Sequence, residues 1–360
     1  MTDTKSTRLA SLDILRGFDL FMLLFVQPVM VSIAHVYDAP WYRLIMHQLD
    51  HEVWQGFRCW DLVMPLFLFM VGAAMPFSFA KYRTASGSHG PVYKRILRRF
   101  LLLFLLGMVV QGNLLGFSAS TLMIYNNTLQ AIAAGYLIAA MILLHCSVKM
   151  QIIMTALLMV IYSVPMALFG DYTPQGSFAF AVDRLVLGDF RGDLTYTWVW
   201  SSLTFGATVM LGALAGTLMK NDRKLPRTRI AGILLVAGIC LVGVGLLAGL
   251  FEPIIKRLWT SSMTLFSGGL CMILMALTYW LVDVKHRSFG LEWLKIYGMN
   301  PITAYCLGEV INFRSVVNSL TYGLQPMLQD WYPVCLTFGN FLLLFFILKF
   351  MYNHKIFLKI

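Results

Sequence analysis

The sequence has few charged residues and no stretch between its apolar runs that is long enough for a second domain. Only 12% of its 360 residues are Asp, Glu, Lys or Arg, and 59% are hydrophobic. A soluble protein is about 25% charged and roughly 45–50% apolar. The apolar residues fall in runs of roughly 18–22, the length that a helix needs to cross a bilayer. The sequence therefore predicts an all-α fold, a polytopic transmembrane helical bundle that forms one domain over residues 1–360.

The sequence also lacks a cysteine pattern typical of metal sites or disulfides, and it lacks a recognisable signal peptide. The six cysteines stand singly in or beside apolar runs, without the spacing of a metal site or a disulfide framework. The first apolar run carries Asp13, Arg16 and Asp19 and ends in no small-residue cleavage site, so we expect no cleavable signal peptide. The net charge is +11. In a membrane protein the positive-inside rule explains such an excess, and we expect a lipid bilayer rather than nucleic acid as the partner.

About ten spanning helices are expected, with both termini on one side. Their predicted bounds are 14–34, 62–80, 100–117, 129–146, a fifth from just after 149 to about 169, 198–219, 230–250, 263–282, 296–311 and 334–351. With a cytoplasmic N-terminus, 21 basic residues fall on the cytoplasmic side and 7 on the other. This bias predicts cytoplasmic termini in a bacterial inner membrane, and it places the loop around residue 51 in the periplasm.

Residues 50–65 contain the main candidate for chemistry. His51 lies among carboxylates and tryptophans, namely Asp50, Glu52, Trp54, Trp60 and Asp61. An imidazole can act as general base, general acid or nucleophile near neutral pH. The carboxylates could fix its tautomer, and the tryptophans could shield it or stack on a ligand. The alternative is a histidine at the membrane surface without a catalytic role.

A metal site at this histidine is the weaker interpretation. His47 and His51 are four residues apart and would share one face of a helix, which is compatible with metal ligation. No Glu follows the first histidine as it does in a zincin motif. We therefore predict no metal.

Further polar groups lie within or beside the apolar runs. Asp13, Arg16 and Asp19 share one helix face, either as an ion pair that sets orientation or as part of a cavity in which the arginine holds a phosphate or carboxylate. Neutral amides at membrane depth are either interhelical contacts or ligand contacts: Asn126, Asn127, Gln130 and Asn300. The aromatic run 196–200 is either an interfacial belt or a surface for stacking a sugar.

Three segments in order carry a resemblance to a known family. They are RLASLDILRG at 8–17, HEVWQG at 51–56 and DLVMPLFLFMVG at 61–72, with weaker matches at 128–132, 183–188, 259–262 and 298–300. Together they resemble the transmembrane acyltransferase family of heparan-α-glucosaminide N-acetyltransferase, and its bacterial branch looks closest. The resemblance covers nearly the whole chain. It implies acetyl transfer from cytosolic acetyl-CoA to a sugar amine across the membrane, with His51 as the catalytic histidine.

The chain departs from the family pattern at three places. Gln27 stands where the family has an asparagine late in the first helix, and Ala131 stands where the mammalian enzyme has an arginine. The Asp-Pro-Glu-Gly loop that follows the Asp-Arg motif in the family is missing. These differences concern the donor contacts and especially the acceptor sugar.

We therefore expect an acetyl-CoA-dependent N- or O-acetyltransferase that acts on a glucosamine-like or other carbohydrate. His51 would be the base or the acetyl carrier, oriented by Asp61 or Asp13. Candidate donor contacts are Arg16, Gln27, Gln130 and Asn300, and the basic residues Arg95, Arg98 and Arg99 could attract the nucleotide. Candidate acceptor contacts are Trp54, Asp183 and Arg184. The alternative function is a transporter for a sugar or small anion, and a homo-oligomer is compatible with both.

Overall fold

The computed structural model describes residues 9–83, 90–112, 114, 121–192, 195–221 and 224–358. Its α-helices are α1 (Ala10–Phe21), α2 (Gln27–Ala34), α3 (Pro40–Gln48), α4 (Val63–Arg83), α5 (Gly90–Gln111), α6 (Thr128–His145), α7 (Val148–Phe169), α8 (Phe178–Leu187), α9 (Ser202–Lys220), α10 (Arg227–Ala248), α11 (Ser261–Tyr279), α12 (Leu294–Met299), α13 (Pro301–Val310), α14 (Phe313–Thr321), α15 (Gln325–Leu328) and α16 (Tyr332–Asn353). Within these described ranges there is no strand, and eight helical segments are long and apolar enough to cross a membrane. The predicted all-α polytopic fold is confirmed.

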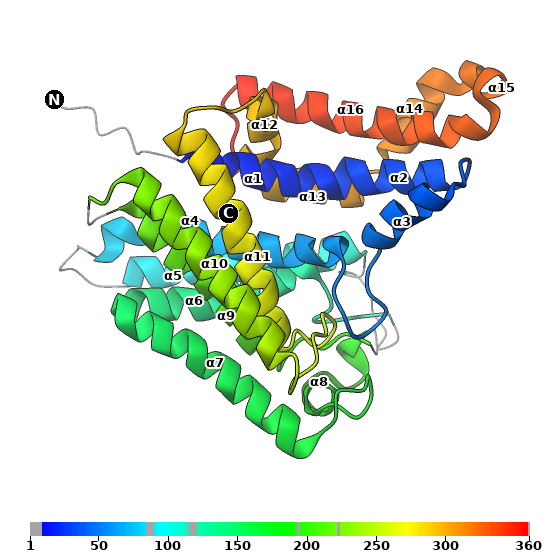
Figure 1. The fold of residues 1–360 in the computed structure, drawn as a ribbon. Coiled ribbons are helices and arrows are strands. Elements are labelled where there is room, and N and C mark those ends of the chain that lie inside the picture. The colour runs from blue at the N-terminus through cyan, green and yellow to red at the C-terminus, as the bar shows by residue number, and fades with distance from the viewer. Residues whose placement is uncertain are drawn as a thin grey trace.

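The helices form two groups that face each other (Figure 1). The larger group contains α4 to α7 and α9 to α11, and the smaller group contains α1, α2, α12, α13, α14 and α16. The smaller group has an apolar core of its own, which includes Leu20, Tyr297, Phe341 and Leu344. Because each group packs around its own core, polar side chains can be accommodated between them.

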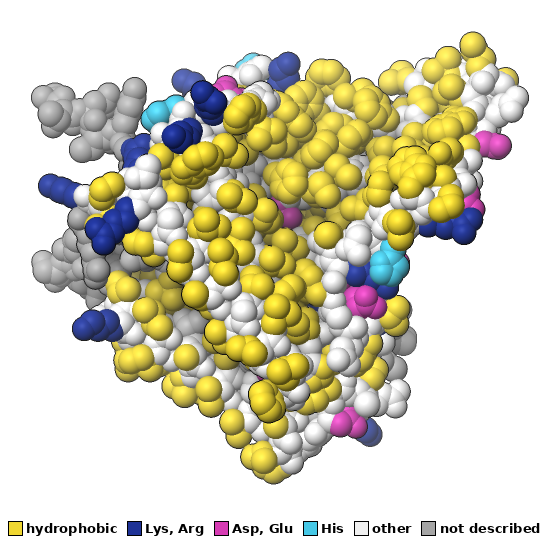
Figure 2. Space-filling model, in the orientation of Figure 1, with side chains coloured by type: hydrophobic (Ala, Val, Ile, Leu, Met, Phe, Trp, Pro, Cys, Tyr) yellow, Lys and Arg dark blue, Asp and Glu magenta, His cyan; other side chains and the backbone are white. Residues whose placement is uncertain are grey.

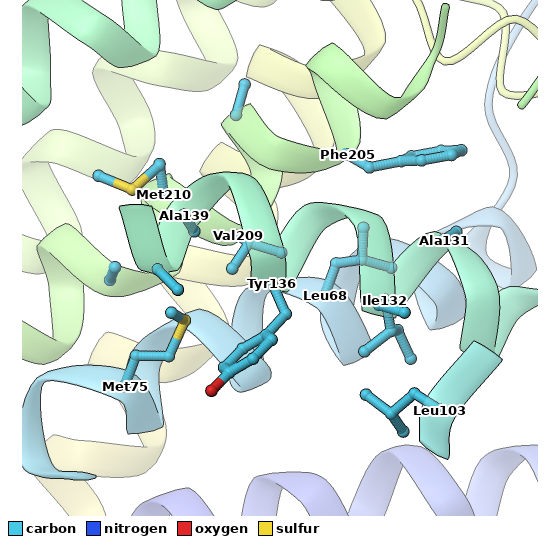
Figure 3. Packing of buried hydrophobic residues seen from close by; sticks show 14 of the residues in the cluster. Leu68, Met75, Leu103, Ala131, Ile132, Tyr136, Ala139, Phe205, Val209 and Met210 are labelled. Carbon is cyan, nitrogen blue, oxygen red and sulfur yellow. The ribbon is translucent and has the colours of Figure 1, made fainter. Parts of the chain in front are cut away.

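Small residues allow the central helices of the larger group to pack backbone against backbone. Gly212 and Gly216 of α9 form a G-x-x-x-G pattern, and Gly72 of α4 lies opposite. A Cβ added to Gly212 would lie 1.9 Å from the carbonyl oxygen of Phe69, and one added to Gly72 would lie 1.8 Å from that of Val209. Such small-residue contacts are a common basis of helix association in membranes. Figure 3 shows the adjoining core, in which α4, α5, α6 and α9 contribute side chains.

A proline breaks the regularity of the first span. Residues Met22–Val26 between α1 and α2 form a wide π turn, in which the N–H of Gln27 donates to the carbonyl of Met22, five residues earlier. Pro28 follows directly and has no N–H to donate to the carbonyl four residues before it. The wider turn is a typical accommodation of this kind of defect, and it lies halfway along the span.

Two predicted helices have different bounds in the structure. The helix predicted at 100–117 is α5, which begins at Gly90 and ends at Gln111, while residues 113 and 115–117 lie outside the described ranges. The basic residues expected in the loop 81–99 therefore fall partly in the first turns of α5, because Lys and Arg are good helix formers. The span predicted at 296–311 is divided between α12 and α13, with a break at Asn300 ahead of Pro301.

Charge is distributed unevenly over the surface. On the face shown in Figure 2, Lys and Arg side chains gather along one edge, acidic side chains lie mostly at the opposite edge, and apolar side chains cover the region between them. The edge rich in Lys and Arg is the one where α1 begins and α4 ends, and α3, α8 and α15 lie at the other (Figure 1). This pattern is expected for a bundle whose apolar middle is surrounded by lipid.

Candidate active site

Two loops that are distant in sequence meet beside His51. The loop between α3 and α4 pairs with the loop between α10 and α11 through an antiparallel bridge between Gln55 and Ile255. The N–H of Gly56 also donates to the carbonyl of Ile254 at 2.9 Å. Lys256 follows directly, so this short pairing brings its ammonium group to His51.

His51, Asp61 and Lys256 form a compact cluster of ionisable groups. The Nδ1 atom of His51 lies 2.8 Å from Oδ1 of Asp61 and 2.9 Å from Nζ of Lys256. The Lys256 ammonium also lies 3.2 Å from the same Asp61 oxygen. The side chains of Asp61 and Lys256 are 1% and 8% exposed, whereas that of His51 is 41% exposed. The imidazole is therefore held through Nδ1, and its side chain remains partly exposed.

The backbone holds Asp61 in this cluster. Its second oxygen, Oδ2, accepts the N–H of Arg58 at 3.0 Å and the N–H of Glu52 at 3.2 Å. The guanidinium of Arg58 donates to both carboxylate oxygens of Glu52 at 2.9 and 3.2 Å, and this contact lowers the pKa of Glu52. A carboxylate that accepts backbone N–H groups is fixed in position and favoured in its ionised form.

The surroundings of Lys256 affect its pKa in opposite directions. Burial lowers the pKa of Lys256 to about 8, and the charge of Asp61 and a hydrogen bond to it act in the opposite direction. The charge of Arg257 adds a smaller lowering effect. Near pH 7 most of the Lys256 side chains are therefore still protonated.

A cavity of about 580 Å³ opens from this cluster into the space between the two helix groups. That volume lies within the range of small-molecule sites. Val63 and Ser78 of α4 both line it, and fifteen residues of helix span roughly 22 Å. Polar residues along its walls are Arg16, His51, Ser78, Arg95, Arg99, Asn126, Asn127, Thr128, Tyr305, Glu309 and Lys256. For comparison, the hydrocarbon core of a bilayer is about 30 Å thick.

Arginines line the cavity far from His51. Arg95 and Arg99 come from the first turns of α5, and Arg16 comes from α1. The Arg99 guanidinium lies over the ring of Tyr136 at 4.4 Å, and Arg95 donates to the hydroxyl of Tyr82 at 3.3 Å. Arg16 donates to the carbonyl of Met70 at 3.3 Å. Arginine at such a site can bind phosphate through charge and paired N–H groups.

Aromatic side chains surround the other end of the cavity. Trp60 is buried with its ring centre 6.4 Å from that of His51, and Tyr196 and Trp198 also line the wall. Asp183 holds this wall, because its carboxylate accepts the N–H groups of Trp198 and Val199 at 2.7 and 2.9 Å. Burial raises the pKa of Asp183 to about 6, although these N–H groups act to lower it.

The comparison with protein families agrees with this geometry. Residues 8–248, about two thirds of the chain, match the family described as heparan-alpha-glucosaminide N-acetyltransferase, catalytic. The chain belongs to this family. A search of curated proteins finds no match. Membership in the heparan-α-glucosaminide N-acetyltransferase family, together with the eight apolar helical segments, indicates a multi-pass membrane protein with acetyltransferase activity.

Within this heparan-α-glucosaminide N-acetyltransferase fold, several predicted contact residues bind the chain itself. The Gln130 amide donates to the carbonyl of Ile124 at 2.7 Å and accepts the N–H of Asn126 at 2.8 Å. The Asn300 amide donates to the carbonyl of Ile356 at 3.0 Å and accepts the N–H of Leu358 at 3.1 Å. These two side chains hold segments whose neighbours line the cavity, and neither lines it directly.

The three predicted acceptor contacts lie away from the large cavity. The indole of Trp54 donates to the carbonyl of Tyr172 at 2.8 Å, Asp183 is buried beneath the 196–200 wall, and Arg184 is exposed. A second cavity of about 490 Å³ lies on the His51 side of the molecule. Its polar lining includes Gln27, Tyr37, Asp38, Tyr42, Arg43, His47, Asp50 and Arg58. Gln27, predicted as a donor contact, thus lines this second cavity.

Of the two carboxylates considered for orienting the imidazole, Asp61 contacts His51. Asp13 lies in the first turn of α1, at the opposite end of the bundle from α3, and forms an ion pair with Arg16 at 3.7 Å. The helical face that His47 and His51 were expected to share does not form, because α3 ends at Gln48. In the described ranges, no group of three or more His, Cys, Asp or Glu could hold a metal ion.

Sequence reasoning missed Lys256 as a site residue. It lies outside the segment that matches the family and was counted only as one basic residue of the periplasmic side. One signal could have found it. Of the seven basic residues predicted on that side, Lys256 is the one lysine, and it lies three residues before the Trp259 motif.

Proposed function

We propose that the chain transfers an acetyl group from cytoplasmic acetyl-CoA to the amine or hydroxyl of a carbohydrate on the periplasmic side. The observation that carries this proposal is the single cavity that connects Arg95 and Arg99 with His51 along roughly 22 Å of α4. A donor with a phosphorylated end and a distant thioester needs such an arrangement. Cations are then available at one end of the site, and a proton acceptor at the other.

The donor would enter from the end that carries the arginines. The predicted bias of 21 to 7 basic residues supports a cytoplasmic location for this end. Arg95 and Arg99 would bind the phosphates, and Arg16 would contribute charge further along the wall. The mostly apolar walls of α4 and α13, with Phe67, Val71 and Ile302, would enclose the chain that leads to the thioester.

His51 would accept the proton of the attacking group. As the acceptor nitrogen or oxygen forms its bond to the acetyl carbonyl carbon, Nε2 of His51 takes the proton from that atom. The bond between carbon and sulfur then breaks, and the same proton is available to the leaving thiolate. The products are the acetylated sugar and the CoA thiol. In the alternative route His51 carries the acetyl group on its ring before the acceptor takes it.

The acceptor would approach from the second cavity. Asp50 and Arg58 line that cavity, and the Asp50 carboxylate accepts the backbone N–H of His51 at 2.8 Å. Carboxylates and amides such as Asp38 and Gln27 suit the amine and hydroxyl groups of an amino sugar. On this proposal the two cavities bring the two substrates together at Nε2 of one imidazole.

The test uses the purified full-length protein sealed into liposomes with glucosamine inside. Radiolabelled acetyl-CoA is added outside, and labelled N-acetylglucosamine inside is measured, with His51→Ala as the control. Transfer in wild type that is lost in the variant supports the proposal. If glucosamine instead leaves the liposomes unchanged in the absence of acetyl-CoA, the chain is a transporter. Because ligands that bind the folded state raise its stability, CoA should raise the thermal unfolding midpoint on the enzyme hypothesis.

The two chemical routes are separated by a single turnover without acceptor. Protein is mixed with radiolabelled acetyl-CoA, quenched and digested, and the peptide that contains His51 is examined by mass spectrometry. An acetylated His51 that forms and then disappears when glucosamine is added indicates the acetyl-histidine route. Label that transfers only when acceptor is present indicates direct attack.

A further inference from the structure

The contacts of His51 raise a question about its protonation. Its Nδ1 atom lies 2.8 Å from an Asp61 oxygen and 2.9 Å from the Lys256 ammonium. A single ring nitrogen cannot donate a proton to the carboxylate and accept one from the ammonium at once. Either Nδ1–H donates to Asp61 while Lys256 donates to the same carboxylate, or Lys256 donates to a bare Nδ1. Only the first arrangement leaves Nε2 without a proton.

Asp61 alone would make His51 a poor proton acceptor. An opposite charge within about 4–6 Å of a titratable group favours its charged form, and here the carboxylate is in direct contact. Asp61 is itself fixed by two backbone N–H groups and almost completely buried, so its charge is hardly screened by water. Contact with an unbalanced buried carboxylate favours the charged form of an imidazole, in which both ring nitrogens carry protons.

The remaining charges around His51 do not change this balance. Glu52 is paired with Arg58, and Asp50 lies 3.9 Å from the same guanidinium. Arg257 lies over the ring of Tyr196 at 5.3 Å. The uncharged neighbour on the remaining side is Trp60. Among the described residues, Lys256 is therefore the cation that directly contacts both Asp61 and His51.

We propose that Lys256 is a positioning residue that balances the charge of Asp61 and so keeps the imidazole of His51 neutral, with Nε2 ready to accept a proton. The Lys256 side chain is 8% exposed and its ammonium lies 3.2 Å from Asp61, so water cannot easily replace its charge. The proposal rests on the proposed function in taking His51 as the proton acceptor. The charge balance itself can be measured without any acetyl transfer.

The experiment follows the reaction of His51 with diethyl pyrocarbonate, which modifies neutral imidazole. The rate is measured from pH 5 to pH 9 on the full-length protein in detergent, by mass spectrometry of the peptide that contains His51. Lys256→Met leaves Asp61 unbalanced and should move the pH midpoint of the reaction upward by about one to three pH units. Asp61→Asn leaves Lys256 unbalanced and should move it downward. Lys256→Arg retains the charge and should stay closer to wild type than Lys256→Met.

The double variant Asp61→Asn with Lys256→Met removes both charges and is the matched control. It should return the midpoint toward that of wild type, and it avoids the unpaired buried charge that could prevent a single variant from folding. A midpoint in Lys256→Met equal to or below that of wild type overturns the proposal. So does an unchanged midpoint in Asp61→Asn, the variant to use if Lys256→Met does not fold.

Acetyl transfer gives an independent readout. In Lys256→Met the acidic limb of the pH–rate profile should move upward together with the reagent midpoint, and activity should recover at higher pH. A residue that only supports the fold would lower the rate at every pH. If the reagent midpoints move as expected and no transfer occurs in any protein, the charge balance holds and the proposed function fails.

Discussion

The two ends of the large cavity hold their charges differently. At the His51 end, cations contact carboxylates, with Lys256 on Asp61 and Arg58 on Glu52. At the other end Arg16 pairs with Asp13, but Arg99 lies over an aromatic ring and Arg95 contacts a tyrosine hydroxyl. Within the described part of the chain, neither Arg95 nor Arg99 forms an ion pair with a carboxylate.

This difference separates a preassembled site from a receptive one. Where charges already neutralise each other, the protein has fixed a geometry and has little remaining charge to offer a ligand. Where arginines meet only rings and hydroxyls, their charge remains available to an anion. The first arrangement suits proton transfer at a defined atom, and the second suits binding of phosphates. The following predictions test that division, from the largest expected effect to the smallest.

Removing the imidazole should have the largest effect on turnover. His51→Ala should lower acetyl transfer by roughly 10² or more, because a positioned base typically contributes 10²–10⁴-fold. The thermal shift caused by CoA should be largely retained, since the arginine end is unchanged. The measurement is the initial rate at saturating acetyl-CoA, together with unfolding midpoints with and without CoA.

The control for this change is His35→Ala, an exposed histidine at the end of α2 that lines neither cavity. It should retain nearly the full rate. A His51 variant with near-normal turnover would refute the assignment of proton transfer to the His51 end of the cavity.

Removing the charges of Arg95 and Arg99 should weaken donor binding without changing the rate of the chemical step. Arg95→Gln combined with Arg99→Gln should raise the Kd for CoA by about tenfold, since hydrogen bonds to charged groups contribute roughly 1.5–3 kcal/mol when buried and less at exposed positions. The rate at saturating donor should change little. Titration calorimetry or thermal shift against CoA concentration measures the effect.

Arg98→Gln is the matched control for the arginine prediction. Arg98 lies in the same helix turns but does not line the cavity. It was grouped with Arg95 and Arg99 from the sequence, and the structure separates them. An Arg98 variant that weakens CoA binding as strongly as the double variant would show that general surface charge, and not this cavity wall, attracts the donor.

The sequence predicted the spans well and long-range contacts poorly. The span predicted at 129–146 is α6 at Thr128–His145, because an apolar run follows an asparagine whose side chain accepts the N–H of Leu129 as a helix cap. The contact between His51 and Lys256 joins residues 205 positions apart and depends on one loop pairing, which no local pattern reveals. The roles of Gln130 and Asn300 were similarly hidden, because their partners are backbone groups of loops and a chain end.

Asn300 tests whether the arginine end depends on the C-terminal segment. Its amide holds the backbone of Ile356 and Leu358, and Leu358 lines the cavity. Asn300→Ala should speed hydrogen exchange at residues 356–358 by about tenfold, since each lost hydrogen bond contributes roughly 1 kcal/mol. The Kd for CoA should change by only a few-fold. A large loss of CoA binding with unchanged exchange would instead make Asn300 a direct donor contact.

The smallest expected effect is a pH dependence of stability at the His51 end, through Asp183. Burial raises the pKa of this carboxyl to about 6, above its value of about 4 in an unfolded chain. The folded state then binds more protons than the unfolded state between these values, so this group's contribution to stability is full below pH 4 and is lost as the pH rises through 6. The loss is roughly 2–3 kcal/mol at most.

The variant Asp183→Asn has no carboxyl group to ionise at this position. Between pH 4.5 and pH 7.5 its unfolding midpoint should therefore rise by a few degrees relative to that of wild type. Thermal unfolding of both proteins across this range measures the difference. If the difference between the two unfolding midpoints is the same at every pH, the Asp183 carboxylate beneath residues 196–200 ionises normally. The His51 end would then not hold all of its charges in fixed geometry.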